Sequence, residues 1–304
     1  METRRRFLRK AGTAASLALA GGLSGLSALS GLSGCKAGAA ERDPREEGQR
    51  EQGRREEGNA RKKLFELGIA SYTFRKFSLD QALAMTRRVG ISRICLKSFH
   101  LPLEAKPEEI AAAARKVKEA GIELYAGGVI TMKDEVEVNQ AFEYAKAAGM
   151  KTIVASPLPK ILPLVSRKVE AYGIQVAIHN HGPGDQDYPT PRSVHDKIKD
   201  LDARVGICID VGHTVRIGAD PVRSVDECAG RILDVHVKDV SAATPQGEEV
   251  EIGRGVIDIP GFLRALLRIG YSGVVAFEHE KDPEDPLPGL AESVGFVRGV
   301  LAAL

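Results

Sequence analysis

The 304-residue sequence lacks several features that would fix its class directly. Its four cysteines show no C-x-x-C spacing, so a disulfide framework is not expected. No Gly-x-Gly-x-x-Gly follows the first predicted strand, which counts against a dinucleotide-binding fold. Tryptophan is absent too, and that absence excludes nothing.

A surplus of positive charge is also missing from the main part of the chain. The formal net charge is +2, but residues 1–63 hold 14 Lys/Arg and 8 Asp/Glu. Residues 64–304 therefore carry 29 Lys/Arg against 33 Asp/Glu, a net charge of −4 with histidine neutral. An acidic domain offers no general footprint for a polyanion, so nucleic acid is not an expected partner. The hydrophobic fraction of 43% is ample for a sizeable core.

The first 35 residues resemble a bacterial export signal. Residues 4–8, RRRFL, are similar to the core of a twin-arginine signal, and the weakly apolar stretch after them fits a signal-peptide core better than a membrane span. Residues 32–35, LSGC, resemble a lipobox with Cys35 as the lipidated first residue of the mature protein; the alternative is cleavage near Ala39. Either way we expect an exported protein, periplasmic or facing outward. A lipid on Cys35 would be its only contact with a membrane.

Residues 36–63 alternate charge with glycine and hold almost no apolar side chain. Such a segment cannot bury a core, so we expect a disordered charged linker. Acids and bases nearly balance within it, which argues against a basic arm for anionic lipid.

Residues 64–304 alternate between β-type runs and amphipathic helical segments. We expect strands at 66–71, 92–96, 122–129, 151–155, 174–179, 205–210, 232–237 and 273–278. We expect helices at 79–89, 107–120, 134–148, 159–172, 190–201, 220–230, 258–269 and 288–303. Eight strand–helix repeats in this length predict an α/β fold, a single (β/α)8 TIM barrel, rather than an open doubly wound sheet.

Four of the expected strands end in polar side chains. The stretch RVGICIDVGH at 204–213 reads as a buried strand that stops at Asp210, an acid whose burial is costly unless a cation meets it. The stretches VAIHNH (176–181), ILDVHVKD (232–239) and VVAFEHE (274–280) repeat this pattern. The C-terminal strand ends of a TIM barrel carry its chemistry, so these side chains are expected to converge there.

One inward residue per strand gives the set His179, Asp210, His236 and Glu278. Singly, each would more often be a satisfied polar group at the barrel mouth. Together, on four consecutive strands, two imidazoles and two carboxylates predict a site for one divalent metal ion. Such a mixed nitrogen and oxygen set suits Mn²⁺, Zn²⁺, Co²⁺ or Fe²⁺ better than Mg²⁺.

Three motifs and a strand-terminal Glu278 resemble the xylose isomerase-like barrel family of sugar-phosphate isomerases and epimerases, ketose 3-epimerases, inosose dehydratases and endonuclease IV. The motifs are Asp210-Val-Gly-His213, His236-Val-Lys-Asp239 and GRGVID at 253–258. The resemblance implies a metal-dependent isomerase or epimerase for a small carbohydrate. It places the metal on Asp210, His236 and Glu278, and the substrate against His213.

The chain departs from this family's pattern at one position. In the epimerases a glutamate after the fifth strand completes the ligand set and shuttles protons with the eighth-strand glutamate. His179 stands in its place here. The chain therefore keeps a ligand set but lacks one of the two opposed carboxylate bases. This difference leaves symmetric epimerisation in doubt.

The remaining carboxylate, Glu278, is our candidate base for removing a proton α to a carbonyl through an enediolate. Lys97, at the end of an apolar strand, is a candidate acid or base on the opposite face; a salt bridge to a carboxylate at the mouth is an equal alternative. Substrate contacts are expected from His100, His181, His213 and Lys238, with His213 also a catalytic candidate.

The sequence does not choose among epimerisation, isomerisation and elimination. An exported location favours a free sugar, keto-sugar or keto-glycoside over a phosphorylated substrate. Two other classes stay open: a metal-dependent hydrolase or lyase of a glycoside or phosphodiester, as endonuclease IV is with three zincs, and a non-catalytic carbohydrate-binding lipoprotein. A homo-oligomer is compatible with the sequence.

Overall fold

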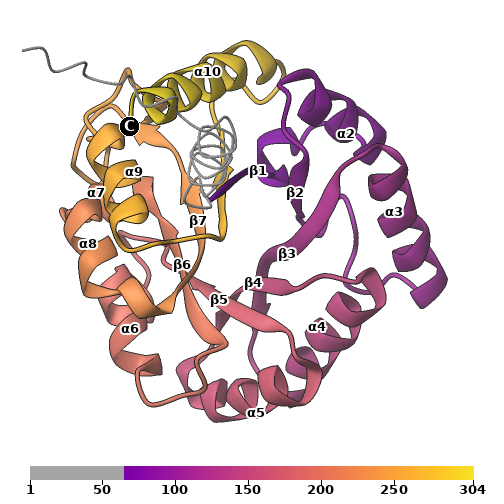
Figure 1. Ribbon diagram of the computed structural model, residues 1–304. Helices are drawn as coiled ribbons and strands as arrows, with labels where there is room; N and C mark the ends of the chain where they lie inside the picture. Colours follow the sequence, from indigo (N-terminus) through magenta and orange to yellow (C-terminus); the bar gives the residue numbers. More distant parts are fainter. Residues whose placement is uncertain (1–64) are drawn as a thin grey trace, which may run out of the picture. The chain divides into compact units, whose positions relative to one another are not determined.

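The computed structural model describes residues 65–304, which form a closed barrel of parallel strands surrounded by helices (Figure 1). The strands follow one another around the barrel in the order β1, β2, β3, β4, β5, β6, β7 and β10, and β10 pairs with β1. Their bounds are β1 Glu66–Ala70, β2 Arg93–Leu96, β3 Glu123–Met132, β4 Thr152–Pro157, β5 Gln175–His179, β6 Val205–Asp210, β7 Ile232–Val237 and β10 Val274–Phe277. The expected TIM barrel is confirmed.

A helix follows each barrel strand along the chain, as expected. The helices with close counterparts in the expected set are α2 Leu79–Arg88, α3 Pro107–Glu119, α4 Glu135–Ala148, α5 Leu162–Tyr172, α6 Pro191–Ile198, α8 Pro221–Glu227, α9 Ile259–Arg268 and α10 Leu287–Ala303. Short 3₁₀ turns occur at η3 Ser71–Phe74, η4 Pro159–Ile161 and η5 Ala229–Arg231.

Local sequence signals account for several helix ends. Ser78 and Gln81 form a reciprocal capping box at the start of α2, and Asp134 caps α4 by accepting a hydrogen bond from the backbone of Glu137. Gly149 and Gly173 end α4 and α5 in the left-handed conformation that glycine adopts without a steric penalty.

The apolar core has two parts. Large aliphatic and aromatic side chains fill the layer between strands and helices, with Phe74, Phe142 and Phe262 fully buried there. The barrel interior holds a smaller cluster, mostly of small side chains: Ala70, Cys95, Tyr125, Ala126, Val154, Ala177, Cys208 and Ala276. Small residues in the interior leave room for the polar side chains at its C-terminal end.

Two elements differ from expectation. Helix α7, Val211–Arg216, begins directly after β6, where we expected a loop before the next helix. An antiparallel hairpin of β8, Asp239–Val240, and β9, Glu249–Val250, follows β7. Both are too short to show a periodic pattern, and both lie beside the predicted site.

The expected signal sequence at 1–35, its lipobox cysteine Cys35 and the linker at 36–63 lie outside the described residues. Within residues 65–304, no helix is both long and apolar enough to cross a bilayer. Among the described residues, Cys95, Cys208 and Cys228 are buried and free.

Candidate metal centre

Four side chains from neighbouring strand ends meet inside the barrel mouth. His179 ends β5, Asp210 ends β6, His236 lies in β7, and Glu278 follows β10. Each offers one ligand atom, and these four atoms all lie within 4.8 Å of one another. All four residues are buried, Glu278 being the most exposed at 7%. The convergence predicted from the sequence is therefore present in the structure.

The backbone around β6 and α7 fixes Asp210. The backbone N–H of His213 donates to Asp210 Oδ1 at 2.7 Å, so one carboxylate oxygen caps α7. The other oxygen, Oδ2, is buried, accepts no hydrogen bond within the described region, and lies 3.4 Å from His179 Nε2. One oxygen of the Asp210 carboxylate thus caps α7, and the other faces the site.

Asn180 is a supporting residue that the sequence analysis missed. Its Oδ1 accepts a hydrogen bond from the backbone N–H of Asp210 at 3.0 Å, and its Nδ2 donates to Thr214 Oγ1 at 3.2 Å. Asn180 is fully buried. Its polarity between two histidines, at the end of an apolar strand, was the signal available in the sequence.

Opposite charges meet around Glu278. Its Oε2 lies 3.2 Å from His236 Nδ1 and 2.9 Å from Lys238 Nζ, and the same ammonium lies 3.2 Å from Asp210 Oδ2. Glu280 also pairs with this ammonium. Burial lowers the pKa of Lys238, but the surrounding carboxylates outweigh burial and hold that pKa well above its usual range.

The same contacts set the charge of the two carboxylates. Burial alone raises the pKa of Glu278, but Lys238 and His236 outweigh it and hold the pKa well below its usual range. Burial likewise raises the pKa of Asp210, but His213 and Lys238 lower it further than burial raises it. Both carboxylates are therefore ionised at neutral pH, as metal ligands and bases must be.

The histidines differ from each other. Burial lowers the pKa of His179 to about 3, so its imidazole is neutral at pH 7. Burial also lowers the pKa of His236, but the ionised Glu278 carboxylate beside Nδ1 outweighs burial and holds that pKa well above its usual range. Neither ring nitrogen of His179 has a hydrogen-bond partner among the described residues. Burying an imidazole without a hydrogen-bond partner costs free energy. A metal ion that binds the lone pair of a ring nitrogen would offset that cost.

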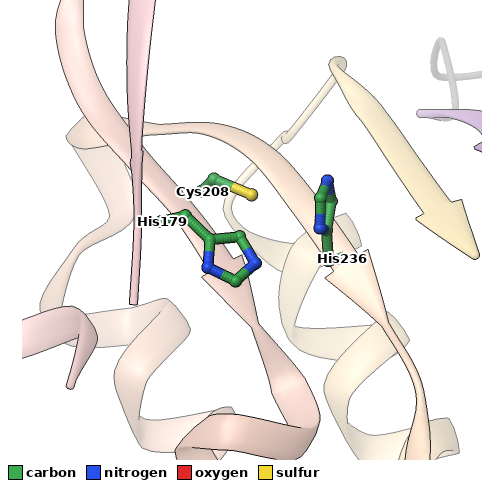
Figure 2. A group of neighbouring side chains, drawn as sticks. All are labelled: His179, Cys208 and His236. Atoms are coloured by element: carbon green, nitrogen blue, oxygen red, sulfur yellow. The ribbon is translucent and has the colours of Figure 1, made fainter. Parts of the chain in front are cut away.

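A second cluster shares both histidines. Figure 2 shows His179, Cys208 and His236, which project toward one another from β5, β6 and β7, again with ligand atoms within 4.8 Å. Burial raises the pKa of the Cys208 thiol, so it stays protonated. The ionised carboxylates of Asp210 and Glu278 therefore offer the better ligands.

A cavity of about 300 Å³ opens beside the four-residue cluster. Its lining includes His213, Arg216, Lys238, Glu249 and Glu280. Helix α7 and the β8–β9 hairpin supply most of its wall. A side chain at Gly212 would place Cβ 2.5 Å from Lys238 Cγ, so this glycine lets the lysine stem cross α7. Three polar atoms at the cavity, His213 Nδ1, Arg216 Nε and Glu249 Oε2, are buried without a hydrogen-bond partner in the described region.

Asp239 joins two of the motifs. Its carboxylate accepts hydrogen bonds from the backbone N–H groups of Val240, Gly253, Gly255 and Ile257, at 2.9 to 3.1 Å. A Cβ on Gly255 would lie 2.1 Å from Asp239 Oδ1, so a glycine is needed there. These hydrogen bonds join Asp239, at the start of β8, to the Gly-Arg-Gly segment at 253–255. The resulting loop structure holds the β8–β9 hairpin at the barrel mouth.

The other expected site residues lie in different surroundings. The His181 ring lies 4.6 Å from that of His179 and faces Asp185, and His213 lines the cavity. His100 is buried, and its two ring nitrogens contact Ser71 Oγ and the Phe77 carbonyl, each at 3.0 Å. This geometry fits a structural role for His100 rather than the expected substrate contact.

Lys97, the expected acid or base on the opposite face, lies over an aromatic ring. Its Nζ is 5.6 Å from the centre of the Tyr72 ring, and its backbone N–H donates to Ser71 Oγ at 2.8 Å. No carboxylate lies within 4 Å of Nζ among the described residues, so the alternative of a salt bridge is not realised there. A cation–π contact keeps the ammonium available to a ligand.

Fold and site together define the class: a TIM barrel with a candidate metal centre at the C-terminal ends of its strands. The chain belongs to the xylose isomerase-like TIM barrel family, whose profile matches residues 90–300.

Among curated relatives, the rhizopine catabolism protein MocC of Rhizobium meliloti is 31% identical over 144 residues, 42% of this chain and 43% of that protein. The inosose dehydratase of Clostridium beijerinckii is 28% identical over 137 residues, 39% of this chain and 45% of that protein. The chain thus matches less than half the length of either relative.

Two solved structures share the fold. The IolI protein with a bound zinc atom has a TM-score of 0.67 at 19% identity, covering 79% of this chain and 99% of that one. L-ribulose 3-epimerase has a TM-score of 0.65 at 18% identity, covering 79% and 95%. At these identities the likeness shows the fold alone.

Proposed function

We propose that the protein is a divalent-metal-dependent enzyme that removes the proton α to a carbonyl of a small carbohydrate, as an isomerase or epimerase. The observation that carries the proposal is the buried cluster His179, Asp210, His236 and Glu278, with its ligand atoms within 4.8 Å of one another. The naming of two similar proteins as an inosose dehydratase and an L-ribulose 3-epimerase supports carbohydrate chemistry.

The residues present fit a metal ion. Both ring nitrogens of His179 are buried without a hydrogen-bond partner in the described region, Asp210 Oδ2 is buried with the Lys238 ammonium 3.2 Å away, and both carboxylates are held ionised. Bonds of about 2 Å from each ligand reach a common centre from atoms this close. A divalent ion held there would supply Lewis-acid stabilisation of the negative charge that develops on the substrate's carbonyl oxygen. Zinc in the similar IolI structure supports this assignment.

Glu278 is the proposed base, because its carboxylate is ionised, is the most exposed of the four ligand groups, and lies 2.9 Å from Lys238, which lines the cavity. Lys238 would hold a substrate oxygen and stabilise negative charge with its ammonium. His213, Arg216 and Glu249 would bind hydroxyl groups with the polar atoms they leave free. The cavity mixes cations with Glu248, Glu249 and Glu280, which suits a neutral polyhydroxylated substrate better than a phosphorylated one.

Elimination is a second candidate outcome, favoured by His179. With a pKa of about 3, this imidazole is neutral at pH 7 and has no imidazolium proton to deliver, and it stands where the family's epimerases have the carboxylate that would reprotonate the opposite face. A single base suffices for loss of a β-substituent, whereas two-base epimerisation needs a partner such as Lys97. The name of the inosose dehydratase relative agrees with this outcome.

Two observations bear on the rival classes. Both candidate metal clusters within residues 65–304 contain His179 and His236, so the described chain offers no separate ligand set for a three-metal hydrolase. In a non-catalytic carbohydrate-binding protein Glu278 would be a metal ligand but not a base, and solvent-deuterium exchange separates that role from the enzyme.

The test combines metal analysis with solvent-deuterium exchange over a panel of free and keto sugars. We expect about one divalent ion per chain and deuterium incorporation α to the carbonyl in wild type. Glu278→Gln should reduce exchange by about 10² to 10⁴-fold, the usual contribution of a general base. Glu292→Gln, in the exposed pair with Arg254, is the matched control and should exchange at the wild-type rate. Undiminished exchange in Glu278→Gln with metal bound would rule Glu278 out as the base.

A further inference from the structure

One fully buried carboxylate, Asp234, has no part in the proposed chemistry. It lies in β7, two residues before His236, so both side chains project into the barrel interior. Asp234 is 0% exposed.

The neighbours of Asp234 come from three other strand positions. The Tyr125 hydroxyl of β3 donates to the two carboxylate oxygens at 3.4 and 3.5 Å, and the Cys208 thiol of β6 approaches Oδ2 at 3.8 Å. The single ion-pair partner of Asp234 within residues 65–304 is His236, whose Nε2 lies 3.7 Å from Oδ2. No lysine or arginine in that region compensates this charge.

The two ring nitrogens of His236 face opposite ways. Nδ1 lies 3.2 Å from Glu278 Oε2 and so points into the candidate metal centre. Nε2 points toward Asp234 and has no hydrogen-bond partner within the described residues. A histidine that binds a metal through one nitrogen almost always donates the N–H of the other to a carboxylate or carbonyl.

We propose that Asp234 is the positioning residue of His236: its carboxylate accepts the Nε2–H and thereby keeps Nδ1 free and directed at the metal. The 3.7 Å separation exceeds a hydrogen bond by roughly 0.7 Å, which a small rotation of the imidazole closes. Tyr125 holds the carboxylate in place from the opposite strand. This inference rests on the proposed metal-dependent function and adds the support of one ligand to it.

A purely structural role is the competing explanation, and it makes a different prediction. A buried carboxylate rarely adds stability, because desolvation opposes the gain from pairing, and neutral replacements of similar shape are often tolerated or stabilising. If Asp234 serves the metal, its neutral isostere should keep the fold and lose metal affinity. If it serves the fold, the reverse should hold.

The experiment measures zinc affinity by chelator competition and thermal unfolding of the metal-free full chain, in wild type and Asp234→Asn. We expect the dissociation constant for zinc to rise about 10- to 100-fold in the variant, the usual effect of changing such a partner. The midpoint of unfolding without metal should stay equal or rise. Asp202→Asn, in the partly exposed pair with Arg204, is the matched control and should leave zinc affinity unchanged.

Nitrogen NMR of histidine-labelled, zinc-loaded protein gives a readout that a structural role would not move. In wild type the Nε2–H of His236 should exchange slowly, and in Asp234→Asn it should exchange faster. Tyr125→Phe, which removes the hydroxyl without touching His236, should weaken zinc binding a few-fold and keeps the test open if Asp234→Asn does not fold.

The outcomes separate the two proposals. If wild type binds no divalent metal, the proposed function fails and takes this inference with it. If wild type binds zinc but Asp234→Asn and Tyr125→Phe bind it equally tightly, the inference alone is overturned. A loss of metal-free stability with unchanged zinc affinity likewise assigns Asp234 to the fold.

Discussion

The two ends of the barrel differ in how their charged side chains are paired and how far they are exposed to solvent. At the N-terminal ends of the strands, Arg93 pairs with Glu66 at 3.0 Å and with Glu123 at 3.1 Å, and the three side chains are 25 to 44% exposed. At the C-terminal ends, Asp210 and Glu278 are buried, and neither ring nitrogen of His179 has a hydrogen-bond partner among the described residues.

This difference separates stability from function. The pairs at the N-terminal end are solvated and complete, so each contributes little, roughly 0–1 kcal/mol. The groups at the C-terminal end are desolvated, and some of their polar atoms lack hydrogen-bond partners among the described residues. This arrangement costs free energy unless a bound ligand supplies those partners. In a TIM barrel that end carries the site. The following predictions, from the largest expected effect to the smallest, test whether the two ends differ in this way.

Removing the charge of Asp210 should have the largest effect on metal binding. Asp210→Asn keeps an amide oxygen to cap α7 but loses the carboxylate that faces His179. We expect zinc affinity to fall more than about 100-fold, beyond the effect of changing a supporting group, measured by chelator competition. Asp220→Asn, at the exposed cap of α8, is the matched control and should bind zinc as wild type does. Equal affinity in the two variants would contradict the assignment of Asp210 as a ligand.

Metal affinity should rise with pH because of His236. In the metal-free protein its pKa is held well above the usual range, so a metal must displace a proton from it at neutral pH. Loss of one proton makes the apparent affinity rise about tenfold per pH unit until the pH passes that pKa. His179, with a pKa of about 3, adds no such dependence above pH 4. Isothermal titration in buffers of different ionisation enthalpy counts the released protons, and a count of zero would refute this prediction.

Lys238 should oppose metal binding, because its ammonium lies 3.2 Å from Asp210 Oδ2 and 2.9 Å from Glu278 Oε2. Lys238→Met keeps the stem over Gly212 and removes the competing charge. We expect zinc affinity to rise several-fold while thermal stability without metal falls, because two buried carboxylates lose a counter-ion. Lys281→Met, at the same cavity but paired with Glu251, is the control and should change neither by much. Weaker zinc binding in Lys238→Met would show that the lysine assists the metal.

Arg93→Ala, at the N-terminal end, should have the smallest effect. Its pairs with Glu66 and Glu123 are partly exposed, so we expect stability to fall by about 1 kcal/mol or less, measured by denaturant unfolding. Zinc affinity should stay at the wild-type value. A change in zinc affinity as large as that of Asp210→Asn would remove the distinction between the two ends.

Much of this arrangement could be predicted from the sequence. Apolar runs that stop at a polar residue placed the barrel strands to within three residues of their ends, and alternation along each strand placed His179 and His236 on the inward face. The short helix α7 and the β8–β9 hairpin could not be predicted, because six residues and two pairs of residues are too few to show a period. The contacts of His100 could not be predicted for a related reason. A histidine that follows a strand has the same sequence pattern whether its side chain faces the site or Ser71.

The sequence by itself determined the order of strands and helices and the chemical character of each strand end, because both follow from local patterns of apolar and polar residues. Only the tertiary structure decided which polar groups share an environment. Closing the barrel brings Lys238 against Asp210 and Glu278, and turns Asp234 toward His236. Charge and metal affinity depend on distances between strands that no single segment of the chain contains.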